Sequence, residues 1–260
     1  MNAIHTIITG VGVFAAGFAN AGAWSAGAPD ATVEAPTGEA LDKRSRRRAS
    51  RLTRALSDVV AEAAAQAGAD LSVVPTVFGS ALGEADTMIG LLDTMWREKA
   101  ALSPTSFAMS VHNAASGLIS IAAGNRGFTT SLAADYDTPG TALLEAVGLA
   151  LADDLPVVVA CADEAAPRDL VPDAERFELL AVALVLARPG SPAAANALAT
   201  MRGPVFEAPT IVGAPARDEL ARNPQIGLLD VVDAVLRGRS GVVRLDRGRG
   251  RGLAVELGAP

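Results

Sequence analysis

The sequence predicts an α/β layered fold around a mainly parallel β-sheet. Between residues 70 and 162, runs of β-branched residues alternate with segments whose apolar residues recur at helical spacing, a pattern typical of βαβ units. Half of the 260 residues are hydrophobic and 20% are charged, so the chain can bury a large core. Only 4% are aromatic, and the many Gly and Ala residues favour close packing between elements.

The N-terminal part is expected to form one strand, one long loop and one helix. Residues 4–9 have the β-branched pattern of a strand that ends at Gly10. Residues 15–42 are rich in Gly, Ala, Pro and acidic residues and are expected to form a loop. Apolar residues then recur at helical spacing over residues 52–63, and Gly68 is expected to end this helix.

The rest of the chain continues the alternation of strands and helices and then becomes less regular. Further strands are predicted over residues 73–80, 128–134, 156–162, 177–187, 242–245 and 253–257. Further helices are predicted over residues 88–95, 111–122, 140–151 and 228–236. Residues 164–175 form a polar connector, and residues 188–225, rich in Pro, Gly and Ala, are expected to be loop with one short helix.

Charge, cysteine content and the N-terminal segment argue against several classes of protein. The net charge of −7 argues against general nucleic-acid binding. The single cysteine, Cys161, cannot form an internal disulfide, and we expect a cytoplasmic protein. Residues 1–28 are apolar, but no Lys or Arg precedes the apolar run and Thr and Gly interrupt it. Neither a signal peptide nor a membrane span is therefore expected.

Few residues are suited to metal or cofactor chemistry. His5 and His112 are the only histidines, and with one cysteine they cannot complete a standard zinc site. Gly10 and Gly12 follow a strand, but a dinucleotide-binding loop would need a third glycine where the chain has Ala15. Cys161 lies in an apolar strand, where a buried thiol is expected to be inert. We therefore expect neither a metal nor a cofactor.

A cluster of basic residues stands out in this acidic chain. Its members are Lys43, Arg44, Arg46, Arg47, Arg48, Arg51 and Arg54. Positive charge near the N-terminus of a helix opposes the helix dipole, so helix stability does not explain the cluster. Two interpretations remain open, a solvated helix start and a docking surface for an acidic partner.

Residues 103–164 contain a further set of motifs. A helix carries Asn113, Gly117, Ser120 and Ile121, a turn follows at Gly124 and Gly127, and the last strand ends in Ala162, Asp163 and Glu164. This block resembles the central part of beta-ketoacyl synthases. In that family a strand follows the turn and leads to a cysteine nucleophile at the head of a buried helix. Counted from Gly127, the cysteine position falls on Tyr136.

The resemblance extends, more loosely, over most of the chain. Residues 7–12 resemble the first strand of the family, residues 48–52 the helix that begins its core, residues 177–186 the first strand of its second half, and residues 250–257 its final strand. It implies a single domain over residues 1–260 with a thiolase-like layered fold (αβαβα). The N-terminal half is then residues 1–165, and residues 176–260 form a shortened C-terminal half.

The resemblance also implies that the catalytic set is lost. The two histidine motifs of the second half are missing, and Ala221 lies near the position of one lost histidine, ahead of the family-like segment 225–232. A phenol cannot replace a thiolate nucleophile, because phenols are protonated at neutral pH and are much larger than a thiol. We therefore expect no condensation chemistry from this chain.

Short relatives of this kind resemble chain length factors, in particular the partner subunits found in aryl polyene biosynthesis. The resemblance implies a heterodimer with a catalytically active beta-ketoacyl synthase, which this chain would stabilise and whose acyl tunnel it would shape in fatty acid or polyketide-type biosynthesis. The implied contacts to the tunnel and partner are Phe107, Met109, His112, Asn113, Phe128, Thr130, Leu132 and Tyr136. Arg46, Arg47 and Arg48 are the implied docking residues for an acyl carrier protein.

Two alternatives remain open at the level of sequence. The chain could be a divergent acyl-thioester enzyme that uses Tyr136 with the flanking carboxylates of Asp135 and Asp137. Those carboxylates could equally serve as hydrogen-bond acceptors at a helix start. The chain could also be a solitary acyl-binding scaffold protein without a synthase partner.

Overall fold

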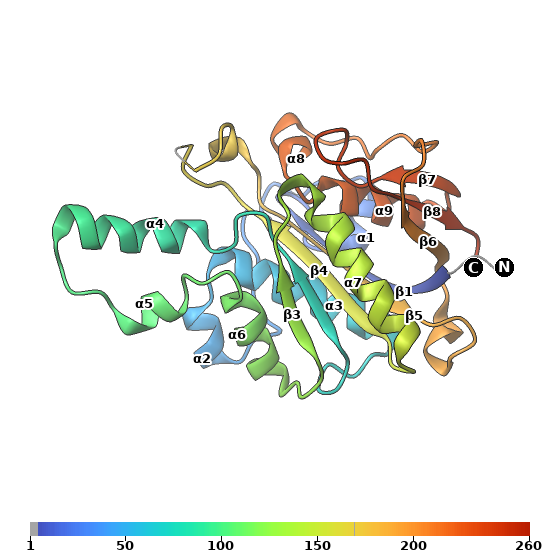
Figure 1. Ribbon diagram of the computed structural model, residues 1–260, viewed down its shortest axis with the longest axis horizontal. Helices are drawn as coiled ribbons and strands as arrows, with labels where there is room; N and C mark the ends of the chain where they lie inside the picture. Colours follow the sequence, from blue (N-terminus) through green and yellow to red (C-terminus); the bar gives the residue numbers. More distant parts are fainter. Residues whose placement is uncertain (1–4, 169) are drawn as a thin grey trace.

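The computed structural model describes residues 5–168 and 170–260, whose eight strands form one mixed sheet. The strands are β1 (His5–Ala15), β2 (Thr76–Gly79), β3 (Thr129–Leu132), β4 (Val157–Asp163), β5 (Leu180–Ala187), β6 (Ala199–Val205), β7 (Gly241–Arg244) and β8 (Ala254–Gly258). Their order across the sheet is β3-β2-β4-β5-β1-β6-β8-β7. Figure 1 shows helices on both faces of this sheet.

The α-helices are α1 (Ala21–Ala26), α2 (Lys43–Arg48), α3 (Arg51–Ala67), α4 (Ala85–Asp93), α5 (Pro104–Ala108), α6 (Ala114–Ala123), α7 (Thr138–Ala152), α8 (Asp218–Arg222) and α9 (Ile226–Leu236). Short helical turns lie at Thr94–Glu98, Asp135–Asp137, Ala174–Arg176 and Pro192–Asn196. Helices α3 and α6 pack on one face of the sheet and enclose one apolar core. Helices α1, α7 and α9 enclose the second core on the other face. The predicted layered α/β fold is thereby confirmed.

The direction of the strands divides the sheet into two regions. β2 pairs in parallel with β3 and with β4, as the alternation over residues 70–162 predicts. The other pairings are antiparallel, so a mainly parallel sheet is wrong for the molecule as a whole. The reason is the connection from β4 to β5, which contains no crossover helix and therefore returns the chain antiparallel.

The C-terminal strands extend the first sheet. β5, which the resemblance places at the start of a second half, lies at the centre of the sheet between β4 and β1. β6, β8 and β7 continue the same sheet beyond β1. The described strands form one sheet between two layers of helices, so the fold has three layers. The resemblance would imply five layers only with a full-length second half.

Strand β1 is longer than the sequence predicts, because Gly10 does not end it. A Cβ atom on Gly10 would overlap the carbonyl oxygen of Ala63, and one on Gly12 would overlap that of Val59. Both glycines therefore allow α3 to lie directly against the strand. Gly68 does end α3, and it adopts the left-handed conformation with φ 68° that glycine favours at this position.

Two elements lie inside segments that were predicted to be loop. Helix α1 is short, but Asn20 caps it by accepting from the Ala23 amide at 2.8 Å, and buried Trp24 anchors it to α9. Strand β6 contains Gly and Pro, and it forms because β1 and β8 pair with it on both sides. In both cases, tertiary contacts compensate for a weak local signal.

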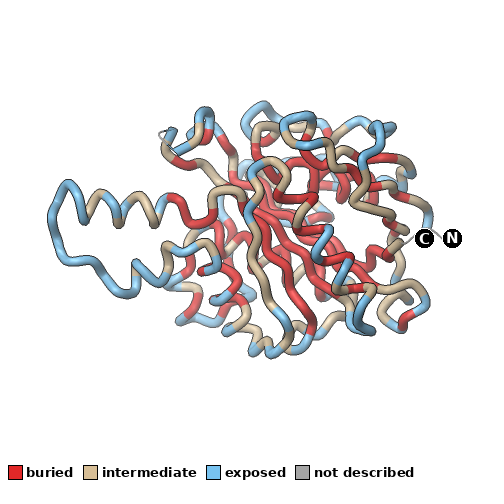
Figure 2. The backbone as a smooth tube through the Cα atoms, in the orientation of Figure 1, coloured by how far each residue is buried: buried red, intermediate tan, exposed pale blue. Residues whose placement is uncertain are grey.

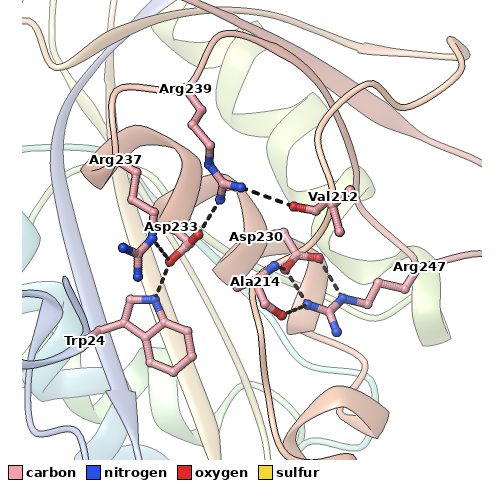
Figure 3. Close-up of polar contacts among 8 residues, drawn as sticks. All are labelled: Trp24, Val212, Ala214, Asp230, Asp233, Arg237, Arg239 and Arg247. Carbon is pink, nitrogen blue, oxygen red and sulfur yellow. Dashed lines mark hydrogen bonds and ion pairs between the residues drawn. The ribbon is translucent and has the colours of Figure 1, made fainter. Parts of the chain in front are cut away.

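Buried carboxylates on α9 hold the C-terminal segments together, as Figure 3 shows. Asp233 accepts from Trp24 Nε1 at 3.0 Å and from Arg237 Nε at 2.9 Å, and it also pairs with Arg239. Asp230, one turn away, accepts from the Ala214 amide and from the Arg247 guanidinium, both at 2.7 Å. These contacts tie α1, the loop before α8 and the segments on either side of β7 to one buried helix.

An arm projects from this body between β2 and α6 (Figures 1 and 2). We define the arm as residues 85–112, which contain α4, the helical turn Thr94–Glu98 and α5. It exposes several large apolar side chains, namely Leu92, Met95, Trp96, Leu102, Phe107 and Val111. None of the helices in the described part of the chain has the length and apolarity that a bilayer crossing requires.

Candidate functional site at Tyr136 and the edge strand

Tyr136 lies in the turn Asp135–Asp137, which connects the edge strand β3 to the head of α7. The hydroxyl of Thr138 fixes this turn, because it donates to the Asp135 carbonyl at 2.7 Å and accepts from the Ala134 amide at 3.0 Å. Asp135 adopts a positive φ of 51°. The tyrosine therefore lies directly before the N-terminus of a long, largely buried helix.

The Tyr136 side chain is half-buried and covered on one side by a C-terminal loop. Its side chain packs against a small apolar cluster that includes Phe177 and Ala174, and the guanidinium carbon of Arg249 lies 5.3 Å from the ring centroid. The Arg251 amide donates to Asp137 Oδ1 at 2.8 Å, which joins the same loop to the turn. The Tyr136 ring thus occupies the space at the N-terminus of α7. Residues 246–252, which we call the arginine loop, cover this ring.

Asp246 holds the arginine loop in its closed shape. Its carboxylate accepts from the Gly248 and Gly252 amides at 2.6 Å and from Arg244 Nε at 2.7 Å. Burial raises the pKa of Asp246, but these hydrogen bonds outweigh burial and hold the pKa below its ordinary value. Asp246 therefore stabilises the loop as an anion.

A buried polar cluster below Tyr136 was not predicted from the sequence. Asp163, at the end of β4, accepts from Ser80 Oγ at 2.8 Å and from the Ala81 and Leu82 amides at 2.8 and 2.9 Å. It also accepts from Gln225 Nε2 at 2.5 Å. Burial raises the pKa of Asp163, while its hydrogen bonds oppose that rise. The only signal in the sequence was an acidic residue at the end of an apolar strand.

This cluster joins three elements. Buried Asn223 donates to the main-chain carbonyls of Asp163 and Glu178 at 2.8 and 2.9 Å. Gln225, directly before α9, is fully buried as well. The segment before α9 therefore supplies two amide side chains, which connect β4, the loop after β2 and α9.

The histidines of the chain do not complete a catalytic group with Tyr136. His5 begins β1, which runs in the same direction as β4, so it lies near the opposite ends of the strands from Tyr136, about 30 Å away along the strand direction. His112 donates from Nε2 to the Ser80 carbonyl at 2.7 Å and contacts Gly83. It therefore holds the end of the arm against the loop where the arm begins.

Other potentially reactive side chains of the chain are held in hydrogen bonds or buried. Asp137 accepts from the Arg251 amide, and among the described residues neither Asp135 nor Asp137 forms a hydrogen bond with the Tyr136 hydroxyl. Cys161 is fully buried in β4, and burial raises the pKa of its thiol. Within residues 5–168 and 170–260, no group of His, Cys, Asp and Glu side chains is arranged to hold a metal ion.

The predicted interface residues lie in different places, on the arm, on β3 and in the groove between α6 and β3. Phe107 and Phe128 are 60% and 51% exposed, whereas Leu132 packs against the core under α7 and Met109 packs against the core under α6. His112, Asn113 and Thr130 line a polar groove between α6 and β3, together with Ser116, Ser120 and Ser131. We call this the hydroxyl groove.

Hydroxyl groups connect the two walls of the hydroxyl groove. Ser116 Oγ lies 2.8 Å from Ser131 Oγ, and Ser120 Oγ lies 3.4 Å from Thr129 Oγ1. Phe128 and Leu132 direct their carbonyls to β2, so strand alternation directs the main-chain amides of Thr129 and Ser131 outward. The outer edge of β3 therefore directs the main-chain amides and carbonyls of Thr129 and Ser131 away from β2.

The opposite edge of the sheet is covered. The amides of Thr210 and Ile211 donate to the Val242 carbonyl on β7 at 2.9 and 3.0 Å, and Val242 donates to Thr210 Oγ1 at 2.8 Å. This loop blocks the pairing positions of β7. The edge at β3 has no such cover from the described residues, so it is the edge at which a strand can be added.

The basic cluster lies on α2 and on the first turn of α3. Arg54 donates to the Arg46 carbonyl at 3.0 Å, which joins the two helices, and Arg51 donates to the Glu34 carbonyl at 2.8 Å. Arg47 and Arg48 are exposed. The cluster is therefore a surface feature beside α6.

The chain matches the family model described as beta-ketoacyl synthase, N-terminal domain, over residues 22–248. A comparison with curated proteins finds no match. One chain of the complex of the ketosynthase ApeO with its chain length factor ApeC, from Xenorhabdus doucetiae, superposes with a TM-score of 0.70 at 21% identity. That alignment covers 98% of this chain and 99% of the other.

Two further solved structures show the same fold. A chain of the AntDE:AntF complex, a type II PKS acyl-carrier protein with its ketosynthase bound to the hexaketide, superposes with a TM-score of 0.72 at 12% identity, covering 99% of this chain and 100% of that one. A beta-ketoacyl synthase from Burkholderia phymatum superposes with a TM-score of 0.58 at 14% identity, covering 76% and 62%. Since the family model spans most of its length, this chain belongs to the beta-ketoacyl synthase family.

Proposed function

We propose that this chain is a non-catalytic partner subunit, of the chain length factor type, for a catalytically active beta-ketoacyl synthase. It stabilises that synthase and shapes its acyl tunnel. The observation that carries the proposal is the family fold with Tyr136 at the head of α7, under the arginine loop. A condensing enzyme needs a thiolate there and histidines beside it, and this site has neither.

The surface around β3 supports a partner of protein nature. Its outward amides and carbonyls are suited to strand pairing, and the other sheet edge is covered by residues 209–212. Phe128, directly before β3, is exposed, and further exposed apolar side chains lie on α6, at Ile121, and on the arm. Apolar exposure of this kind is typical of a surface that is buried in a complex.

Two of the solved structures with this fold are complexes that contain a ketosynthase, one with a chain length factor and one with an acyl-carrier protein. This supports the choice of a synthase as the partner and of an acyl carrier protein as a further one. We propose aryl polyene synthesis, a branch of fatty acid and polyketide-type chemistry, as the setting. Arg46, Arg47 and Arg48 are proposed to contact the carrier protein.

The heterodimer is tested by co-expression with a full-length beta-ketoacyl synthase from the same genome. Ser131→Pro removes an outward main-chain donor without removing a hydrogen bond to β2, and it should abolish co-purification. Ser131→Ala is the matched control, since it loses only the side-chain contact to Ser116 and should retain the complex. Equal retention by both variants would contradict pairing at this edge.

The tunnel role is tested by the length of the product. Phe107→Ala on the arm should shift the acyl chain length made by the complex, whereas Phe206→Ala, a 76% exposed phenylalanine beyond β6, should not. Unchanged product lengths with Phe107→Ala would remove this part of the proposal. Replacing Arg46, Arg47 and Arg48 by Glu should weaken binding of the holo carrier protein in surface plasmon resonance, and unchanged binding would remove the docking role.

A further inference from the structure

A cavity of about 460 Å³ lies at the covered edge of the sheet, where the loop of residues 209–213 faces β7 and the start of the arginine loop. We call it the edge cavity. Its size is within the range of small-molecule sites in proteins. β7 and β3 are at opposite ends of the strand order, so the edge cavity is remote from the proposed synthase contact and from the hydroxyl groove.

The walls of the edge cavity are held by hydrogen bonds within the chain. The Thr210 and Ile211 amides donate to the Val242 carbonyl, which fixes one end of the loop on β7. The other end is fixed on α9, because the Ala214 amide donates to Asp230 Oδ1 at 2.7 Å. A cavity with walls of this kind needs little ordering when a ligand binds, and a smaller ordering cost favours affinity.

Two arginines bring hydrogen-bond donors to the lining of the edge cavity. Arg247 donates from Nε to Asp230 Oδ2 at 2.7 Å and from Nη2 to the Ala214 carbonyl at 2.8 Å. Arg244 donates from Nε to Asp246 Oδ1 at 2.7 Å. Among the hydrogen bonds of the described residues, none uses Arg247 Nη1 or a terminal nitrogen of Arg244. Figure 3 shows the remaining nitrogen of Arg247 directed away from Asp230.

The backbone around Arg247 accommodates this arrangement. Arg247 has a φ of 47°, in the left-handed region that is unfavourable for residues with a side chain, and its contacts with Asp230 and Ala214 outweigh that cost. Gly213 faces the ion pair from the loop. A Cβ atom at Gly213 would lie 2.8 Å from Arg247 Nη2 and 2.9 Å from Asp230 Oδ2. Glycine therefore allows the loop to lie directly against the ion pair.

The charges and the apolar lining favour one kind of ligand. Arg244 pairs with Asp246 and Arg247 pairs with Asp230, so these four side chains together carry no net charge. A carboxylate monoanion can accept charge-assisted hydrogen bonds from the terminal guanidinium nitrogens. A phosphate dianion would need an excess of positive charge, which the two aspartates cancel. Aliphatic side chains complete the lining beside these donors, namely those of Ile211, Val212 and Val243.

We propose that the edge cavity binds a small organic carboxylate. Its carboxylate group accepts hydrogen bonds from the terminal nitrogens of Arg244 and Arg247. Its apolar body, a short acyl chain or a ring, lies against Ile211, Val212 and Val243. The proposal does not rest on the role of this chain beside a synthase, because these residues belong neither to the strand edge at β3 nor to the arm.

A ligand-detected NMR titration of the full chain tests the site with hexanoate as the probe. Hexanoate should bind in a saturable way. Hexanamide has the same apolar body without the charge, and acetate has the charge without most of the body, so each should bind about tenfold more weakly or worse. Inorganic phosphate at the same concentration should not displace hexanoate.

Val212 offers a substitution that should not disturb the fold, because its side chain lines the edge cavity but is 83% exposed. Val212→Glu should weaken hexanoate binding about fivefold or more, because the new carboxylate repels the ligand and competes for the arginines. Val212→Lys is the matched variant of opposite charge and should retain or strengthen binding. Phe206→Glu adds the same charge outside the cavity lining and should change binding less than about twofold.

Arg244→Met removes the terminal donors of one arginine and should weaken hexanoate binding about tenfold. Circular dichroism confirms that each variant is folded. Absence of saturable hexanoate binding to the wild-type chain would overturn the proposal. Equal affinity for hexanoate and hexanamide would overturn the recognition of an anion, and tighter binding of phosphate than of hexanoate would overturn the choice of a carboxylate.

Two comparisons locate the site and separate it from the proposed function. Equal weakening by Val212→Glu and Phe206→Glu would overturn the edge cavity as the site, since it would indicate repulsion by overall charge. Val212→Glu should still co-purify with a synthase, because the edge cavity and β3 are at opposite ends of the sheet. Loss of hexanoate binding in an intact complex therefore reports on the edge cavity, and loss of the complex in Ser131→Pro reports on the strand edge.

Discussion

Asp163 allows a quantitative test of how the arm is attached to the body. In Asp163→Ala, the hydroxyl of Ser80, the amides of Ala81 and Leu82 and the side-chain amide of Gln225 lose their acceptor. A buried donor left without an acceptor costs about 1 kcal/mol or more, so four of them predict a loss near 4 kcal/mol in the free energy of unfolding. That is a large fraction of the stability of an ordinary domain.

Asp163→Asn separates hydrogen bonding from charge. Its carbonyl oxygen can still accept from Ser80 and Leu82, and its amide can donate to Gln225 Oε1, which has no partner among the described residues. The Ala81 amide and Gln225 Nε2, which both donate to the second carboxylate oxygen, are then left without that acceptor, so we expect a loss of about 2 kcal/mol. Urea unfolding followed by circular dichroism measures the free energy of unfolding of both variants. Hydrogen exchange at residues 80–83 reports the local stability of the loop that leads into the arm.

The direction in which stability changes with pH tests the same account of Asp163. Burial raises the pKa of Asp163 above its ordinary value, so the carboxyl stabilises the fold most where it is protonated. That stability is present below the unfolded pKa and is lost as pH rises through the folded pKa. The advantage of wild type over Asp163→Asn should therefore shrink as pH rises. An Asp163→Ala loss below about 1 kcal/mol, or an advantage that grows with pH, would refute this account.

Three further predictions concern packing, titration and catalysis. Gly12→Val should destabilise the fold by about 3 kcal/mol or prevent folding, because the side chain meets the Val59 carbonyl, whereas Gly117→Ala should be neutral or stabilise by up to about 1 kcal/mol in thermal unfolding. Burial, together with the nearby Asp86 carboxylate, raises the pKa of Glu164 to about 7. Wild type should therefore lose stability as pH rises through neutrality, and Glu164→Gln should lose less. Equal pH profiles of stability for the two proteins would contradict this. Tyr136→Cys should form no condensation product from acyl-thioesters, because the catalytic histidines are absent, and product formation in a mass-spectrometric assay would refute the proposed loss of catalysis.

The sequence predicted most elements whose local pattern is strong. Helix α3 ends at Gly68 as expected, and the buried strands β4 and β5 were recognised from their apolar runs. The sequence was less informative at glycines, because a glycine can have more than one structural role. Gly10 was interpreted as a strand end, because a missing side chain signals a turn and a close helix contact equally well. The spacing of residues could not distinguish a strand end from a close helix contact, because Ala63 on α3, which lies against Gly10, is distant in sequence.

The candidate site divides in a similar way. The place of Tyr136 followed from its count of residues beyond Gly127, and the structure places it at the head of α7. Its cover did not follow, because Arg249 and Arg251 reach it from the other end of the chain. The hydrogen bonds to Asp163 were equally hidden, since their donors come from two loops far apart in sequence.

By itself, the sequence determined the layered α/β fold, the family resemblance and the presence of only two histidines, and it predicted that Tyr136 lies at the head of a helix. These follow from local patterns and from counts of residues. Only the tertiary structure decided that the C-terminal strands extend the first sheet, that one sheet edge is covered while the other is open, and that Arg244 and Arg247 line a cavity. Strand pairing and surface shape depend on which distant segments meet, and that is set by packing of the whole chain.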